Sequence, residues 1–291
     1  MLHSVKFPLP SPLLRNDFIA QVAAPLLFAV WIGASSALLT APAGSRANTS
    51  AATVPHLLTQ YDWPTYLGDK GRRQYSPLDQ INRRNVAGLR VAWTYDSGDK
   101  GEFQCNNLII DGRLFTASPA RNVIALDAAT GRELWRWDPA SEGVALAGNR
   151  QRGLVYWENP SGGQSRLFTS AGPHLYALDP VTGEIIRSFG DGGKVHLGIG
   201  LGEENAPSMS LNTPGIIYKD LLIFGVFSNA PGGVRAIDVR TGQIRWHFNL
   251  IPRPGDVGYE TWPTEAYKTA LGANDWSGQS LDEERGCLLY T

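Results

Sequence analysis

Apolar and polar residues recur along this chain in units of short strands separated by tight turns. Three segments share an apolar strand, an Asp-x-x-Thr-Gly turn and a second strand with large apolar residues; they begin at residues 125, 177 and 236 and read ALDAATG, ALDPVTG and AIDVRTG. In such a turn the Asp side chain accepts bonds from the backbone that follows, and Gly supplies a positive φ. A repeat of about 50 to 60 residues indicates stacked or radially arranged units, and the four-stranded blades of a β-propeller fit it. We expect the aromatic residue of each unit to pack against the neighbouring unit.

Further segments predict the other strands of these blades. Asp111-Gly112, flanked by apolar residues, predicts a hairpin with a type I′ turn. Strands or strand pairs are also expected over residues 89–95, 121–137, 166–176, 216–224 and 234–248. A helical apolar period is weak throughout this part, and one short helix is expected near 79–86. The fold class predicted is all-β, a propeller with about four blades over residues 61–291.

The first 43 residues have the order of an export signal. Basic residues precede an apolar run over about 18–39, and small residues follow at 41–47. A cleaved signal peptide and an uncleaved membrane anchor both fit the length of this run. Either one predicts a protein exported to a bacterial periplasm. Residues 44–60, rich in Ala, Ser and Thr, are expected to form a linker before the domain at 61–291.

Composition excludes some partners and leaves the ligand open. The formal net charge is −1 without a basic block, so no surface for nucleic acid is predicted, and membrane contact is expected only through an N-terminal anchor. The two cysteines, Cys105 and Cys287, are expected to be small buried strand residues, with a bridge between them as the alternative. The five histidines show no metal-ligand spacing.

Several motifs resemble one family. Residues 63–93 contain WPTYLGD, YSPLDQIN and NVAGLRVAW, and the chain then carries RGLVYW at 152–157, IPRPG at 251–255, ETW at 260–262 and GANDW at 272–276. Taken in order, these motifs resemble the N-terminal half of pyrroloquinoline-quinone (PQQ) dehydrogenases, in their glucose-dehydrogenase-like branch. The resemblance implies an eight-bladed propeller with PQQ and Ca²⁺ on its axis. It also implies oxidation of a small-molecule alcohol or sugar, with a quinone or cytochrome c as electron acceptor.

The resemblance also implies a partial cofactor site. Arg152 matches the arginine that bonds the quinone side of PQQ, where a planar donor fork suits quinone and carboxylate oxygens. Gln104 matches a residue facing a PQQ carboxylate, and Thr169 matches a cofactor-contact threonine. Asn229 falls near a calcium-ligand position, where oxygen ligands are required. A surface ion pair for Arg152 and ordinary strand packing for Gln104 and Thr169 are the alternatives.

Two departures from the family pattern limit the assignment. Leu146-Ala147 stands where methanol-type relatives have adjacent cysteines, which argues against that branch. The chain ends before the family's PQQ-stacking Trp and catalytic Asp, so no catalytic base is assigned and residues 1–291 alone are expected to be inactive. The alternative function is a non-catalytic envelope scaffold for protein assembly, because such propellers share the blade repeat. The segment 152–157 distinguishes the two, since a scaffold does not need it.

Overall fold

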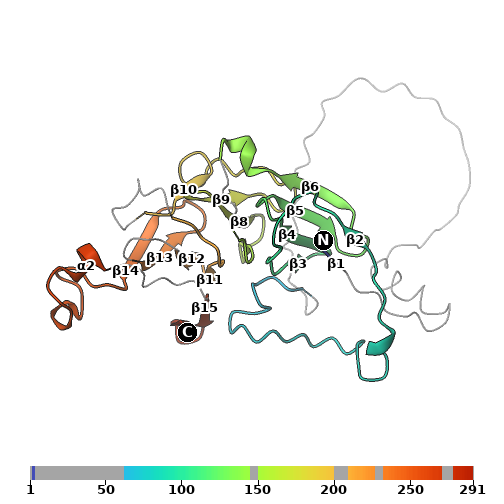
Figure 1. Ribbon diagram of the computed structural model, residues 1–291, viewed down its shortest axis with the longest axis horizontal. Coiled ribbons are helices and arrows are strands. Elements are labelled where there is room, and N and C mark those ends of the chain that lie inside the picture. The colour runs from blue at the N-terminus through green and yellow to red at the C-terminus, as the bar shows by residue number, and fades with distance from the viewer. Residues whose placement is uncertain are drawn as a thin grey trace, which may run out of the picture.

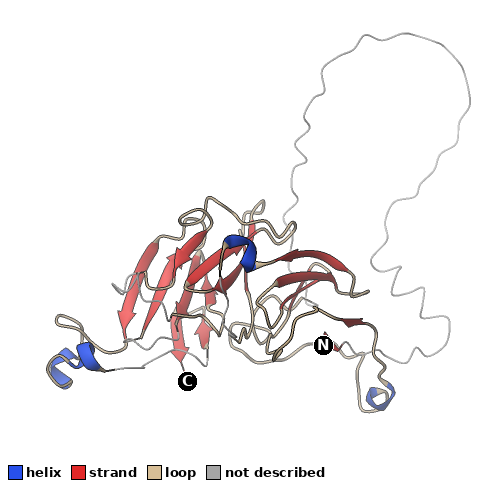
Figure 2. Cartoon of the chain, turned by 45° about the horizontal axis from the view of Figure 1, so that its top comes forward, coloured by secondary structure: helices blue, strands red, loops and turns tan. Residues whose placement is uncertain are grey.

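The computed structural model describes residues 2–3, 62–144, 150–199, 209–226, 232–270 and 278–290. Strands make up most of the regular structure in these ranges, and the helices are short (Figure 2). The predicted export segment and linker lie outside the described residues apart from Leu2–His3, so both stay predictions. Within the described ranges, no helix is both long enough and apolar enough to cross a bilayer.

Three antiparallel four-stranded sheets, here called blades 1 to 3, form the body of the described protein. Blade 1 consists of β3 (Leu108–Ile110), β4 (Arg113–Ala117), β5 (Val123–Asp127) and β6 (Glu133–Trp137). Blade 2 consists of β7 (Val155–Glu158), β8 (Ser165–Ala171), β9 (His174–Leu178) and β10 (Lys194–His196). Blade 3 consists of β11 (Ile216–Tyr218), β12 (Leu221–Gly225), β13 (Gly233–Asp238) and β14 (Ile244–Asn249). The strands of each blade follow chain order, and the blades lie side by side, from the green strands to the orange ones in Figure 1.

Shorter elements flank the blades. The strand pairs outside them are β1 (Leu2–His3) with β2 (Thr94–Tyr95), and β15 (Gln279–Asp282) with β16 (Cys287–Tyr290). The helical turns are η1 (Val86–Gly88), η2 (Pro139–Glu142), η3 (Tyr259–Thr261) and α2 (Ala266–Thr269). The described residues therefore contain three complete blades and one further hairpin, which is close to the four blades expected.

The predicted turns have the predicted geometry. Asp111 and Gly112 join β3 to β4 with φ of 50° and 67°, as a type I′ turn requires. In the first repeat, Asp127 Oδ1 accepts hydrogen bonds from Thr130 N at 2.9 Å and Thr130 Oγ1 at 2.8 Å, and Gly131 has φ of 74°. The second and third repeats form the same turn, and their Gly residues have φ of 77° and 74°.

Aromatic side chains pack between neighbouring units at the first two turns, as predicted, whereas Trp246 and Phe248 of the third unit are exposed in the described structure. Trp93 lies against Gly131 and donates from Nε1 to Ala128 O at 3.2 Å. Trp135 in blade 1 lies against Gly183 in blade 2 and donates to the carbonyl of Pro180 at 3.1 Å. Buried apolar side chains fill the rest of both interfaces between blades. Hydrophobic burial and these recurring tryptophan contacts hold the blades together.

Three local expectations need correction. Residues 79–86 do not form a helix, because the side chains of Asn82 and Asn85 accept bonds from the nearby backbone, and only the 3₁₀ turn η1 follows. Of the strand expected over 89–95, only Thr94–Tyr95 forms a described strand, and Arg90 forms an isolated bridge. Both cysteines are free, and neither is a buried strand residue: Cys105 is partly buried and lies outside the strands, and Cys287 in β16 is exposed.

The N-terminal segment 63–70 crosses the first strands of the blades. Trp63 N donates to Ile109 O at 2.7 Å in blade 1. Further along, Lys70 accepts a backbone bond from Leu281 at 2.9 Å and forms an ion pair with Glu283 at 2.5 Å. Residues about 200 positions apart thus meet beside the first strands of the blades.

Candidate cofactor-binding site

The segments that lead into the first strand of each blade converge on Arg152. This end of the blades is called the inner end, and the opposite end, with the Asp-x-x-Thr-Gly turns, is called the outer end. Asn106 N, just before β3, donates to Arg152 O at 2.7 Å. The backbone N–H of Arg152, just before β7, donates in turn to Asn212 O at 2.8 Å, just before β11. Arg152 is therefore the central member of three adjacent segments, one from each blade.

Gly153 permits this close approach. A Cβ atom at Gly153 would lie 2.8 Å from Tyr66 Cδ2, 3.1 Å from Pro214 Cγ and 3.4 Å from Asn106 O. The first distance is shorter than real carbon contacts, so a larger residue would force the segments apart. The Arg-Gly pair in the sequence is thus explained by packing as well as by the chemistry of the arginine.

Polar side chains surround Arg152 at this end of the blades. Arg152 is half-buried, and its Nη1 donates to Thr213 Oγ1 at 3.3 Å. Gln104 is also half-buried and donates from Nε2 to Glu102 Oε2 at 3.0 Å. The same carboxylate oxygen pairs with Arg150 Nε at 3.1 Å, so Gln104 and Arg150 share one acidic partner. Arg152 lies two residues further along the chain. The polar rim is the name used here for Glu102, Gln104, Arg150, Arg152 and Thr213.

Thr169 lies behind this rim rather than on it. It is 2% exposed, and its Oγ1 accepts a bond from Gln151 Nε2 at 3.3 Å. Gln151 also donates to Gly153 O at 2.9 Å. Thr169 therefore supports the backbone around Arg152 in this structure, and its direct contact with a cofactor stays a prediction.

The expected metal position is not described. Asn229 and Leu146-Ala147 both fall in ranges outside the described residues. In the ranges that are described, no three His, Cys, Asp or Glu side chains gather as a metal site. The assignment of Asn229 as a calcium ligand therefore stays a prediction.

One residue that sequence reasoning missed lies directly beneath the rim. Arg121, in the loop between β4 and β5, is 1% exposed, and its guanidinium bonds to groups beside Arg152. Burial lowers the pKa of Arg121 to about 10, so it keeps its charge at neutral pH. The polar run SPARN at 118–122 between two apolar strands was the available signal, but it is also typical of an ordinary surface loop.

Comparison with known proteins identifies the family. The sequence profile described as "Glucose/ethanol/alcohol dehydrogenase, beta-propeller domain", designated PQQ, matches residues 63–290. The chain belongs to this PQQ dehydrogenase family. The match covers all three blades and the β15–β16 hairpin, so the propeller predicted from the repeats is confirmed.

Individual relatives agree with the family. The quinate/shikimate dehydrogenase (quinone) of Acinetobacter baylyi is 31% identical over 266 residues, a match that covers 79% of this chain and 32% of the relative. The dehydrogenase subunit of the alcohol dehydrogenase (quinone) of Gluconobacter oxydans is 34% identical over 229 residues, covering 75% of this chain and 29% of the relative. The solved quinohemoprotein alcohol dehydrogenase from Comamonas testosteroni shares the fold, with a TM-score of 0.64, 23% identity and coverage of 77% of this chain and 34% of that one. The chain thus spans about a third of the length of these relatives.

The donors at the inner ends fit PQQ chemically. PQQ carries carboxylates and two adjacent quinone carbonyls, so a site for it needs positive charge and hydrogen-bond donors. Arg121, Arg150 and Arg152 supply three guanidinium groups, and Gln104 supplies an amide. Glu102 pairs with Arg150 in this group.

A separate cavity lies elsewhere, beside the N-terminal segment. It has a volume of about 500 Å³ and is lined by Tyr66, Lys70, Trp157, Ile216 and other residues of β7 and β11. Neither Arg152 nor Gln104 lines it. The polar rim is therefore a surface formed by the converging ends of the blades and is distinct from this cavity.

Proposed function

We propose that this chain supplies one wall of a PQQ site in an enzyme that oxidises the CH–OH group of alcohols or sugars. The observation that carries the proposal is the central position of Arg152 among the converging blades, with Thr213 bonded to its guanidinium. A family membership that covers most of the chain supports it.

Each predicted residue has a role in this proposal. Arg152 would hold the quinone side of PQQ through its planar donors, and Gln104 would donate to a carboxylate. Thr169 would support the site through Gln151, and Asn229 would be one oxygen ligand of Ca²⁺. When bound, PQQ would supply the redox chemistry, because its reduction to the quinol takes up the two electrons and two protons that oxidation of a CH–OH group releases.

The substrate and the acceptor are the finer parts of the proposal. We expect a sugar of the glucose type or a simple alcohol as substrate, and a quinone or cytochrome as acceptor. The relatives described above are named as quinone-linked enzymes for quinate or shikimate and for alcohol, which supports a quinone acceptor and a hydroxylated substrate. Glucose, ethanol and quinate are therefore the three substrates to compare in a dye-linked assay.

Replacement of Arg152 tests the cofactor site. We expect Arg152→Ala, in protein expressed from the complete gene, to weaken PQQ binding by at least about 1.5 kcal/mol, because a charged hydrogen-bond partner is lost. Titration of the apo-protein with PQQ in the presence of Ca²⁺ measures this. Arg187→Ala is the control, because Arg187 is 63% exposed and paired with Glu142 away from the site. Equal affinity of Arg152→Ala and wild type would remove Arg152 from the site.

Export to the periplasm forms part of the same proposal and rests on the pattern of the first 43 residues. If the signal is cleaved, the mature protein in a periplasmic extract should begin at about residues 44–48. N-terminal sequencing measures this start. Retention of Met1 on membrane-bound protein would establish an anchor instead.

A further inference from the structure

Arg121 joins the three blades beneath the polar rim. Five of its hydrogen bonds go to described residues: Nη1 donates to Gln151 Oε1, Ser170 O and Ser170 Oγ, each at 3.0 Å, and Nη2 donates to Arg150 O at 3.1 Å and Asn212 Oδ1 at 2.9 Å. Arg121 belongs to blade 1, Ser170 to blade 2, and Asn212 leads into blade 3. A buried group with so many directed bonds fixes the relative positions of its acceptors.

These acceptors are the immediate neighbours of Arg152. Arg150 and Gln151 precede it in the chain, and Asn212 accepts its backbone N–H. Arg121 therefore holds the backbone of Arg152 from two directions without touching its guanidinium in the described contacts.

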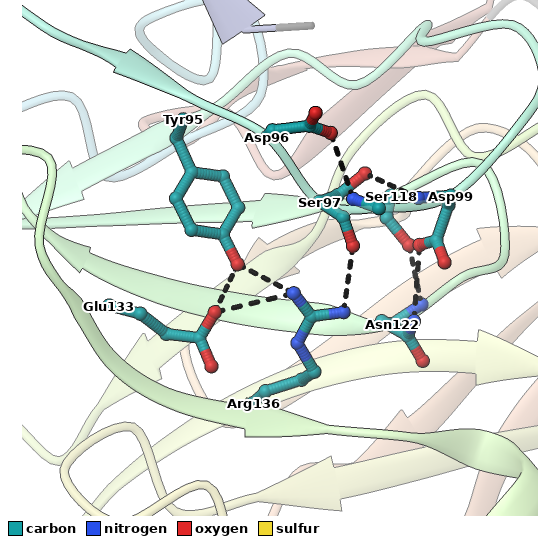
Figure 3. A network of polar contacts seen from close by, with 9 residues as sticks. Tyr95, Asp96, Ser97, Asp99, Ser118, Asn122, Glu133 and Arg136 are labelled. Atoms are coloured by element: carbon teal, nitrogen blue, oxygen red, sulfur yellow. Dashed lines mark hydrogen bonds and ion pairs between the residues drawn. The ribbon is translucent and has the colours of Figure 1, made fainter.

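The loop that carries Arg121 is itself fixed by the network in Figure 3. Asn122 Nδ2 donates to Asp99 Oδ2 at 3.1 Å, and Asn122 N donates to Ser118 Oγ at 3.1 Å. The segment around Asp99 is anchored in turn by Arg136, which donates to Ser97 O at 3.1 Å and to Tyr95 Oη at 2.6 Å. This support from two sides restricts Arg121 to one position.

We propose that Arg121 is a positioning residue for PQQ, which fixes the direction of Arg152. The inference rests on the proposed function, since it concerns the same site. It follows from preorganisation: a donor whose backbone is held in place loses less entropy on binding than a mobile one.

The test compares two buried arginines. Arg121→Lys keeps the charge but loses the planar fork, and we expect it to weaken PQQ binding by about tenfold, as loss of a supporting partner does at other sites. Arg166→Lys is the control, because Arg166 is 6% exposed, lies at the opposite end of β8 from Ser170 and stacks on Phe189 with 5.9 Å to the ring centroid. Quenching of tryptophan fluorescence by PQQ, in protein from the complete gene, gives each affinity. Thermal unfolding without PQQ gives each stability.

A double-variant cycle separates positioning from a general structural role. If Arg121 acts through Arg152, adding Arg121→Lys to Arg152→Lys should change PQQ affinity by less than about twofold. Should Arg121→Lys fail to fold, Asn212→Ala removes one of the five bonds while keeping the backbone carbonyl that Arg152 uses, and it should weaken binding to a smaller extent.

The outcomes are distinguishable. Unchanged PQQ affinity in Arg121→Lys, or in Asn212→Ala where that variant replaces it, would overturn the inference alone. An equal loss in the Arg152→Lys background would overturn the claim that Arg121 acts through Arg152. An equal loss in Arg166→Lys would show a general effect of buried arginines. Absence of PQQ binding by the wild type would refute the proposed function and this inference together.

Discussion

The two ends of the same blades differ in how far their residues repeat from one blade to the next. At the outer end, the Asp-x-x-Thr-Gly turns repeat almost without change, and the three Gly residues differ in φ by only a few degrees, from 74° to 77°. At the inner end, each blade presents a different side chain: Gln104, Arg152 and Thr213. Repeated residues make the blades alike, whereas an unsymmetrical ligand can be recognised only where the blades differ. The residues that set the fold and those of the proposed binding site therefore lie in separate parts of each unit.

At the outer end, the glycine of each turn is also closely packed against the preceding unit. Two contacts use tryptophan, Trp93 against Gly131 and Trp135 against Gly183. The third uses Val195, because a Cβ at Gly242 would meet its Cγ2 at 2.6 Å and the backbone of Gly190 at 3.0 Å. The close approach is thus kept although the aromatic partner is not, which identifies glycine as the constant requirement.

The largest effect is expected from adding a methyl group to this contact. In Gly183→Ala the new Cβ would lie 2.5 Å from Trp135, at a φ of 77°. Backbone strain and overpacking together should lower the free energy of unfolding by about 3 kcal/mol. Denaturant unfolding of the purified protein measures the loss.

Gly143→Ala is the matched control for that variant. Gly143 has a similar φ of 73°, but a Cβ there would meet no atom within 4 Å. The strain of the left-handed conformation alone should lower the free energy of unfolding of this variant, by about 1 kcal/mol. Equal losses in the two variants would show that the tryptophan contact adds nothing and that the outer end is held by turn geometry alone.

The structure of the outer end could be predicted from the sequence, whereas the contacts at the inner end could not. Each Asp-x-x-Thr-Gly turn is a local structure, so its residues, its positive φ and its flanking strands follow from a few adjacent positions. The packing of Trp135 on the next unit followed from the repetition of those positions. The strand expected over 89–95 was mostly absent because pairing depends on a partner far away in the chain.

The site depended on contacts between distant segments. Arg152, Gln104 and Thr169 were proposed from a family resemblance, and nothing local in the chain indicated that Arg152 would lie between Asn106 and Asn212. Arg121 was missed because a charged residue in a polar loop is normally exposed. Only the three-dimensional arrangement buries it, by bringing acceptors from blades 2 and 3 against its guanidinium.

The smallest expected effect is a dependence of stability on pH, which comes from the turn of Asp127 at the outer end. The hydrogen bond from the Thr130 hydroxyl, with backbone bonds from the same turn, lowers the pKa of Asp127 below its usual value. A depressed pKa in the folded state adds stability above the unfolded pKa of about 4, and this stability is lost as the pH falls through the folded pKa. Asp127→Asn keeps an acceptor oxygen but does not titrate. We therefore expect it to unfold at a lower temperature than wild type at pH 7, with the difference closing below about pH 4. Thermal unfolding across this range measures both proteins, and a difference that stayed constant with pH would show that the charge of Asp127 does not stabilise the turn.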